Sequence, residues 1–387
     1  MNSDDDLVIL GGGCAGLSLA MRLAERGEQC PQTTIIEPRE SYDHDRTWCF
    51  WGTPSAQLSA LVRHRWNRVQ VMADGHRLEV DCTATPYEMI PASVFYATAL
   101  KAISQNHRLR FCGGTSFDGE PVRRGDRWEI STTQGMLRPR WIVDTRPLRP
   151  PQRDDALLWQ SFCGLEIHCE TECFNPECAT LMDFLPTTDQ RIMFLYVLPT
   201  STRQALVELT VFAPDPLGPD MLQPILMQVL AERLKIAPPQ VIRAESGSLP
   251  MGLSSIRNRP HPDWIRAGLP GGGARPASGF AFQRIQRWAD QCAGLLTQGL
   301  RPCAPRTDPW RLRAMDDLFL RVLRRHPEAA PDLFLRLFAL RDFAAMVRFL
   351  SDCPSWTDCR RIICALPPGL FLGELGKTLL STNNFRS

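Results

Sequence analysis

Short apolar runs and one amphipathic stretch alternate over the first forty residues. The apolar run 7–10 leads into a group of glycines, and the segment 17–26 that follows is expected to be helical. A second apolar run, 33–36, comes next. Strand, turn, helix and strand in this order predict a βαβ unit.

Beyond this unit the pattern predicts short strands, hairpins and two helices. An Asp-Gly pair joins two short runs in the manner of a β-hairpin, and a longer polar turn joins two apolar strands of a second, antiparallel sheet. Trp141 and its neighbours are expected to return to the first sheet. The expected strands are 66–71, 77–80, 109–113, 122–130, 135–143, 191–198 and 204–212, and the expected helices are 91–103 and 221–234.

The remaining segments are a loop, a crossing and a helical end. Residues 41–54 are expected to form an irregular loop rich in aromatic and charged side chains, and the Pro-rich segment 146–153 a crossing between domains. A second glycine-rich loop, 268–273, precedes a predicted helix over 280–296. From residue 308 onward the chain is predicted to be helical, with Leu, Phe and Arg interleaved.

Charge, apolar runs and cysteines restrict the function classes. The 387 residues include 44 basic and 42 acidic side chains without a long block of one sign, so a nucleic-acid partner is not expected. The N-terminus is acidic and no apolar run reaches the length that spans a bilayer. We expect a cytoplasmic protein that touches a membrane without crossing it.

The 14 cysteines are scattered along the chain and are expected to be reduced. Cys163, His168, Cys169, Cys173 and Cys178 lie close in sequence but lack the paired spacing of structural zinc sites. We therefore expect no metal.

The glycines after the first strand predict a dinucleotide site. Gly11, Gly13 and Gly16 stand between a strand and a helix, where the backbone can approach a pyrophosphate whose charge lies on the helix N-terminus. Glu37 ends the second strand, where an acid can bind a ribose hydroxyl. FAD and NAD(P) both remain possible, although the position of the motif at the start of the chain favours FAD.

Several segments, taken in their order along the chain, resemble the bacterial lycopene beta-cyclase family. This family belongs to the flavoprotein group related to p-hydroxybenzoate hydroxylase and geranylgeranyl reductase. The matching segments run nearly end to end and are 45–51, 87–91, 143–147, 160–162, 182–184, 194–199, 205–208, 272–286 and 348–352. The resemblance implies an α/β fold with a Rossmann-like FAD-binding domain, an inserted antiparallel-sheet substrate domain and a C-terminal helical region.

The resemblance also implies a domain division and a reaction. The FAD-binding domain would comprise 1–65, 84–152 and 245–305, the substrate sheet 66–83 and 153–244, and the helical region 306–387. The family closes the linear psi ends of lycopene into beta-ionone rings by acid catalysis. It uses non-covalently bound FAD in its reduced form, without net redox change, and NAD(P)H is the expected source of electrons.

Glu208 is the expected proton donor, because it stands in the acidic strand motif of the family. Alternation places Leu206, Glu208, Thr210 and Phe212 on one face of a strand, and an apolar wall opposes ionisation of a carboxyl group. Leu209 replaces the second acid that many relatives have directly after the glutamate, which puts a two-acid motif here in doubt. A salt-bridged strand glutamate is the alternative interpretation.

Further candidates follow from the resemblance. Asp183 is a second candidate acid, with a buried structural role as the alternative. The aromatic substrate candidates would line a tunnel for the polyene and offer their faces to a cation, and core packing is the alternative interpretation. Arg46 and Arg284 would contact a phosphate or ribose of FAD, and an ion pair at a domain interface is the alternative interpretation. The cofactor candidates are Gly11, Gly13, Gly16, Glu37, Arg46, Asp144, Gly272, Gly273 and Gly279, and the substrate candidates are Trp48, Phe50, Trp51, Phe194 and Tyr196.

Two other functions fit the same sequence. The first is a flavin-dependent prenyl or polyene reductase, or a monooxygenase, of the same fold. The second is a non-catalytic flavoprotein that binds carotenoids. The expected partners are lycopene and related carotenoids, a membrane surface and other carotenoid enzymes.

Overall fold

A computed structural model describes the chain. The described residues are 5–52, 55–147, 153–186, 190–236, 239–253 and 261–383. Residues 53–54 of the expected irregular loop and 148–152 of the expected crossing lie outside this part.

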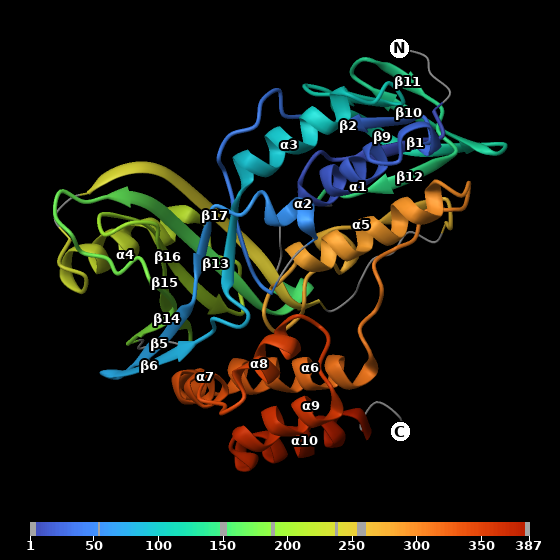
Figure 1. Cartoon of the computed structure of the whole chain (residues 1–387). Helices are drawn as coiled ribbons and strands as arrows, with labels where there is room; N and C mark the ends of the chain where they lie inside the picture. Colours follow the sequence, from blue (N-terminus) through green and yellow to red (C-terminus); the bar gives the residue numbers. More distant parts are fainter. Residues whose placement is uncertain are drawn as a thin grey trace.

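The first layer is a five-stranded parallel sheet at the N-terminal end of the molecule (Figure 1). The order of its strands is β18 (Trp264–Arg266), β12 (Trp141–Asp144), β1 (Leu7–Leu10), β2 (Thr33–Ile36) and β8 (Leu109–Cys112). The βαβ unit and the return of the chain at Trp141 are therefore confirmed.

Alternation decides which layer covers each face of this sheet. Leu7 and Ile9 of β1 pack with helices α1 (Cys14–Ala24), α3 (Ala92–Ser104) and α5 (Phe282–Leu296). Val8 and Leu10 point the other way and pack on a small antiparallel sheet formed by β9 (Phe117–Arg124), β10 (Arg127–Thr132) and β11 (Gly135–Leu137).

The small sheet corrects two strand predictions. Residues 122–130 form parts of two antiparallel strands, because Gly125, with a φ of 63°, turns the chain between them. Residues 135–143 likewise divide into β11 and β12, which belong to different sheets.

The second layer is a seven-stranded sheet that carries the substrate-domain segments. Its order is β17 (Gln240–Leu253), β13 (Ala156–His168), β16 (Gln204–Ala213), β15 (Ile192–Pro199), β14 (Cys178–Leu185), β5 (Arg68–Ala73) and β6 (His76–Asp81). The hairpin predicted around Asp74 and Gly75 and the one joining β15 and β16 are both confirmed. The boundary expected at residue 245 falls within β17, which pairs with β13 along its length.

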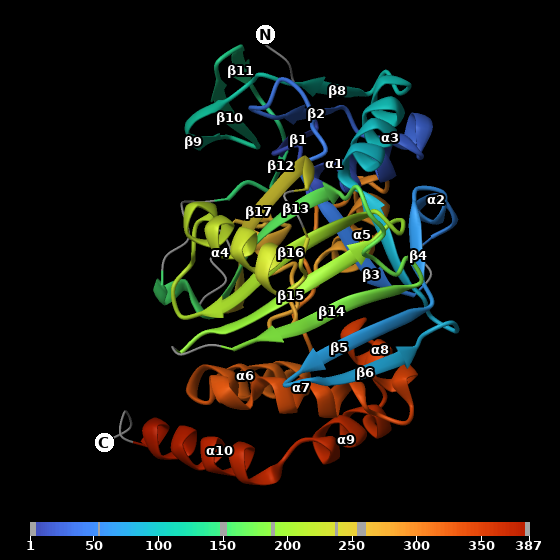
Figure 2. The same ribbon diagram turned by 90° about the vertical axis from the view of Figure 1, so that its left-hand side faces the viewer.

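Different helices cover the two faces of this sheet (Figure 2). Helix α4 (Pro219–Glu232) packs on one face through Leu222, Leu226 and Leu230. The C-terminal helices pack below the other face, as Figures 1 and 2 show from two sides, and they form the end of the molecule opposite the parallel sheet. They are α6 (Trp310–Arg325), α7 (Ala330–Phe338), α8 (Phe343–Leu350), α9 (Trp356–Ala365) and α10 (Pro368–Asn383).

A short sheet joins the two layers and corrects the expectation of an irregular loop. Residues 47–51 form β3 (Thr47–Trp51), which pairs with β7 (Tyr87–Pro91), and β7 also pairs with β4 (His64–Trp66). The aromatic side chains of β3 supply buried surface on both of its faces, which accounts for a strand here.

The remaining short elements are helical turns, and no described helix is both long and apolar enough to span a membrane. The turns are η1 (Gly27–Gln29), α2 (Ala56–Ser59), η2 (Arg153–Asp155), η3 (Leu269–Gly271) and η4 (Pro327–Ala329).

Candidate functional site

The glycine turn between β1 and α1 forms a cradle at the helix N-terminus. Gly11 has a φ of 100°, and a Cβ atom at Gly16 would lie 1.9 Å from the carbonyl oxygen of Gly11. Gly13 caps α1, and a Cβ atom there would meet nothing within 4 Å. Two glycines thus shape a tight turn, while the third leaves open space in front of a helix N-terminus, where a phosphate binds favourably.

Glu37, at the end of β2, is already hydrogen-bonded. Its Oε2 accepts a hydrogen bond from the amide of Gly12 at 2.6 Å, and its Oε1 one from Nε of Arg39 at 2.8 Å. Burial opposes ionisation of Glu37, but these donors outweigh it and lower the pKa of the carboxyl group. The ionised carboxylate of Glu37 can accept a further hydrogen bond from a ribose hydroxyl beside those from Gly12 and Arg39.

The late glycine loop packs beside the first one. A Cβ atom at Gly268 would lie 3.1 Å from the Cβ of Ala15 in α1. Gly272 has a φ of 78°, and a Cβ atom at Gly273 would lie 2.7 Å from the carbonyl oxygen of Gly268. The loop therefore needs its glycines for shape, and it brings a second set of backbone groups to the N-terminus of α1.

The other cofactor candidates occupy different settings. Asp144 is 1% exposed at the end of β12, where it pairs with Nε of Arg146 at 3.0 Å and NH2 of Arg266 at 3.8 Å. Arg46 lines the large cavity described below and donates to the carbonyl of Asp45 at 2.7 Å. Gly279 lines the same cavity, beside Gln160.

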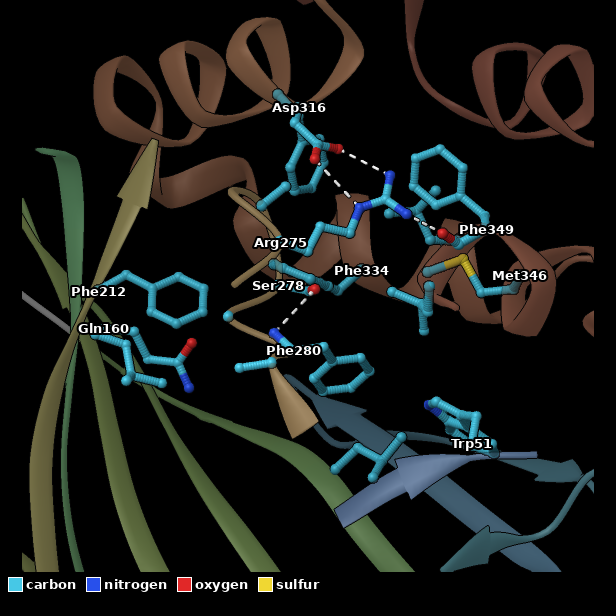
Figure 3. Close-up of a pocket in the computed structure, with 18 of the residues that line it drawn as sticks. Trp51, Gln160, Phe212, Arg275, Ser278, Phe280, Asp316, Phe334, Met346 and Phe349 are labelled. Carbon is cyan, nitrogen blue, oxygen red and sulfur yellow. Dashed lines mark hydrogen bonds and ion pairs between the residues drawn. The ribbon is translucent and has the colours of Figure 1, made fainter. Parts of the chain in front are cut away.

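One large cavity connects this cradle to the C-terminal helices. Its volume is about 1320 Å³. Gly13 and Cys14 line it at the cradle, Glu208 at the seven-stranded sheet, and Phe334 and Met346 at the helices. Figure 3 shows Phe212 on the sheet side facing Phe334, Met346 and Phe349 on the helical side. Most of the surface of the cavity is apolar, although charged residues such as Arg46, Glu208 and Glu245 also line it. A largely apolar surface is typical of a site for an apolar ligand.

Four of the five substrate candidates line this cavity, namely Trp48, Trp51, Phe194 and Tyr196. Trp48 stacks on Phe282 at 5.4 Å between ring centroids. Phe50 does not line the cavity; it is buried in the core and also stacks with Phe282, at 5.3 Å between ring centroids.

Glu208 lies on β16 and faces the cavity, in the company of Thr210 and Phe212. It is 8% exposed, and its Oε1 accepts a hydrogen bond from the hydroxyl of Thr210 at 2.8 Å. Burial, and next the charge of Glu245, raise the pKa of Glu208 to about 8, against smaller opposing effects of Thr210 and Arg46. The carboxyl group is therefore protonated at neutral pH and borders an apolar cavity.

Two tyrosine hydroxyls lie on the same side of the sheet. Tyr196 of β15 stands opposite Glu208 in the strand register, and its hydroxyl is 2.8 Å from that of Tyr87. Burial raises the pKa of both tyrosines, which remain neutral. They add polar groups that carry no charge at this point of the wall.

Asp183 lies elsewhere. It is on β14 and is 3% exposed, and Nε of Arg233 donates to it at 3.0 Å, with a second bond from NH2 of the same arginine. Among the residues described it does not line the cavity, although its neighbour Met182 does. The geometry places Asp183 in an ion pair beside α4.

Arg284, also on α5, is engaged by acids of the C-terminal region, at 2.7 Å from Asp308 and 3.1 Å from Asp352. These surroundings agree with the alternative interpretation of Arg284, an ion pair at an interface between regions of the chain.

Two features of the site have no counterpart in the sequence analysis. Arg275 follows the late glycine loop and is 1% exposed; it pairs with Asp316 of α6 at 3.0 Å and donates to the carbonyl of Phe349 in α8 (Figure 3). Arg275 thereby fastens the loop to the helices. The second feature is Glu245 of β17. The sequence signals it only by an arginine, Arg243, two positions before it.

In the described part of the chain, no group of three or more His, Cys, Asp or Glu residues is placed to hold a metal ion. The cysteines from 163 to 178 are free.

Comparison with known proteins was made by sequence and by structure. The family model "Lycopene cyclase protein" matches residues 6–371. A lycopene beta cyclase from Synechococcus elongatus is 28% identical over 323 residues, which cover 76% of this chain and 72% of the relative.

Solved structures share the fold at low sequence identity. A flavin-dependent brominase has a TM-score of 0.62 at 12% identity and covers 98% of this chain and 100% of its own. A geranylgeranyl bacteriochlorophyll reductase-like protein from Thermoplasma acidophilum has a TM-score of 0.57 at 11% identity, covering 94% and 96%. A p-nitrophenol 4-monooxygenase from Pseudomonas putida gives 0.57 at 13%, covering 98% of each chain. The expected fold is therefore confirmed.

Proposed function

The chain belongs to the lycopene cyclase family, and from this premise we propose that it is a lycopene beta-cyclase that closes the linear psi ends of lycopene into beta-ionone rings. The products would be gamma-carotene after one closure and beta-carotene after two. The observation that carries the proposal is Glu208, a buried carboxylic acid on the wall of a largely apolar cavity that begins at a dinucleotide cradle.

The reaction is an isomerisation, an intramolecular lyase reaction in formal terms, and needs no net redox change. A proton adds to a carbon of the terminal double bond, a ring carbon–carbon bond forms from the resulting tertiary cation, and a proton leaves a neighbouring carbon. The acid must be neutral before the reaction, and water must be kept from the cation.

Glu208 supplies the proton in this proposal. Its raised pKa keeps the O–H bond intact at neutral pH, and Phe194 and Phe212 add apolar surface to the same wall. Trp48 and Trp51 present aromatic rings to the same cavity, and aromatic faces attract a cation. The apolar part of the lining offers no hydrogen bond to water.

The residues around the two glycine loops fit an FAD molecule. Gly13 would admit the pyrophosphate at the N-terminus of α1, Glu37 would accept a ribose hydroxyl, and Arg46 and Gly279 line the cavity where it leaves the cradle. When bound in its reduced form, FAD would supply negative charge that stabilises the cation. NAD(P)H would be the source of the electrons that reduce it.

A membrane surface is the proposed place where the substrate enters. Five large apolar side chains of the C-terminal helices are exposed and also line the cavity, at 71% exposure for Trp310 and 68% for Trp356. Arg311 lies over the Trp356 ring at 4.6 Å. The five are Trp310, Trp356, Ile363, Leu372 and Leu375. An apolar cavity mouth with a neighbouring arginine suits peripheral contact with an anionic lipid surface.

Pigment analysis tests the proposed activity. A lycopene-accumulating bacterial host that expresses this chain is expected to make gamma-carotene or beta-carotene, which chromatography separates from lycopene. Unchanged lycopene beside a soluble, flavin-loaded protein would contradict the proposal. A product with fewer double bonds, formed while NAD(P)H is consumed in equal amount, would indicate a reductase of the same fold.

Flavin binding is tested by a pair of glycine substitutions. Gly13→Ala meets no protein atom within 4 Å, so the protein should fold, but the added methyl group would occupy the space where a phosphate approaches. We expect loss of most of the co-purified flavin, measured by absorbance. Gly294→Ala in α5 also meets nothing within 4 Å and is the matched control, which should keep its flavin. Equal flavin content in both would contradict the assignment of the cradle.

A further inference from the structure

Glu208 has a carboxylate neighbour two strands away. Gly164 of β13 stands opposite Glu208 of β16 on one side and opposite Glu245 of β17 on the other. The three residues thus form one row across the sheet. Side chains in such a row point to the same face, and both glutamates line the cavity.

The glycine between them leaves room for the two side chains to approach. A Cβ atom at Gly164 would lie 3.3 Å from Cβ of Glu208 and 3.3 Å from Cγ of Glu245. Both side chains therefore border the same small space above Gly164. Any larger residue at this position would press on both of them.

The two carboxyl groups have unequal partners. Oε2 of Glu245 accepts hydrogen bonds from NH1 of Arg243 at 2.5 Å and from the hydroxyl of Thr47 at 2.8 Å. Arg243 is held from its other side by Glu166 at 2.6 Å. Among the described residues, no arginine forms an ion pair with Glu208, which accepts a hydrogen bond from the hydroxyl of Thr210. Because two like charges this close do not ionise together readily, Glu245 carries the charge and Glu208 keeps the proton.

The surroundings of Glu208 leave Glu245 as the main charge acting against its ionisation. Burial raises the pKa of Glu245 as well, although the opposing effects of Arg243, Thr47 and Arg46 limit this rise. The titratable and charged groups that face Glu208 come from four strands and the segment before β3; they are Arg46, Cys49, Tyr87, Tyr196 and Glu245. Of these, Arg46 is the one cation and favours ionisation.

Building on the proposed cyclase function, we propose that Glu245 is the second acid of the site, a positioning residue that holds Glu208 in its neutral, proton-donating form across the gap left by Gly164. Leu209, the next residue of β16, faces the core on the other side of the sheet. The second carboxylate comes from β17. After it has protonated the substrate, Glu208 is ionised, and it takes up the proton that leaves the ring cation or one from solvent, because the fixed charge of Glu245 disfavours the ionised form.

The pH dependence of cyclisation tests this proposal. Glu245→Gln removes the charge and keeps the shape, so ionisation of Glu208 becomes easier and the alkaline limb of the rate profile should move down by on the order of one pH unit. Glu245→Asp keeps a charge and should return the limb toward its original position. Glu166→Gln, which removes the other carboxylate on Arg243, is the matched control and should leave the limb in place.

A second readout does not depend on turnover. The infrared band of the protonated Glu208 carboxyl group, taken as the difference between each protein and the same protein carrying Glu208→Gln, reports its titration directly. The titration should move to lower pH in Glu245→Gln and in Gly164→Ala, which forces the two carboxyl groups apart. Gly164→Ala supplies this measurement if Glu245→Gln does not fold.

The outcomes separate this proposal from the proposed function. An unmoved titration of Glu208 in Glu245→Gln and Gly164→Ala would overturn the role of Glu245, even if the enzyme cyclises lycopene. A shifted titration in a protein that forms no ring would uphold the carboxyl pair and contradict the cyclase function.

Discussion

The two faces of strand β16 differ sharply, although they alternate residue by residue. Glu208, Thr210 and Phe212 face the cavity, where polar and aromatic groups border an empty space. Leu209 and Val211 face α4 and pack in an aliphatic core with Leu226. One face is therefore built for a ligand and the other for stability.

The difference shows why one position tolerates an acid and the next does not. The carboxyl group of Glu208 has a hydroxyl partner and borders the cavity. Burial there raises its pKa, and the neutral form is accommodated without disrupting the sheet. Leu209 is 0% exposed and is surrounded by apolar side chains. A carboxylate at this position would be buried without a hydrogen-bond donor or a cation in its surroundings. An apolar residue such as Leu209 suits this packing.

The largest expected effect is on the cavity face. Glu208→Gln keeps the size of the side chain but removes the transferable proton, so cyclisation should fall about 100- to 10 000-fold. The rate is measured with purified, flavin-loaded protein and lycopene in liposomes. The thermal midpoint of the variant should stay close to that of the wild type, and a variant that retains most of its activity would remove Glu208 from the mechanism.

The next effect belongs to the opposite face. Leu209→Ala creates a cavity against α4 and should lower the free energy of unfolding by about 3 kcal/mol, measured by denaturant titration. Activity per folded molecule should change little, because the side chain does not reach the cavity. A loss of activity comparable to that of Glu208→Gln in well-folded protein would show that the two faces are not independent.

A pH profile sharpens the comparison. The pKa of Glu208 is raised to about 8, so the neutral donor predominates below that pH and declines tenfold for each unit above it. Cyclisation should therefore be level in the neutral range and fall as the pH rises through about 8. The Leu209→Ala protein should show the same limb. A rate that rises with pH over this range would argue for an ionised base in place of the acid.

The smallest effect concerns the other candidate acid of the sheet. Asp183→Asn breaks the ion pair with Arg233, which is 39% exposed, and should lower the free energy of unfolding by about 1–2 kcal/mol. Cyclisation per folded molecule should fall far less than in Glu208→Gln. If it falls as far, Asp183 acts in the chemistry despite its position.

Local patterns in the sequence predicted the elements whose partners are near in the chain. The strand and glycine turn from Leu7 to Gly16 and the hairpin around Gly75 depend on neighbouring residues, and both are found in the structure. The long strand β17 was not predicted, since polar residues such as Glu245 and Ser246 stand next to each other in it and interrupt the alternation of apolar and polar positions.

The site itself was predictable only in part. Glu208 stands in a motif that the sequence displays. Glu245 approaches it because Gly164, over forty residues from Glu208 and over eighty from Glu245, leaves a gap in the strand between them. A contact of this kind depends on strand order and register across three strands, which no local pattern determines.

The incorporation of solvent deuterium tests the central claim most directly. Glu208 exchanges its proton with solvent between turnovers, so cyclisation in D₂O should add one deuterium for each ring formed while one hydrogen leaves the carbon skeleton. Mass spectrometry should then find a product one mass unit heavier per ring than the product made in H₂O, with the loss of this reaction in Glu208→Gln. An unlabelled cyclic product, or a labelled one formed equally by Glu208→Gln, would contradict the account.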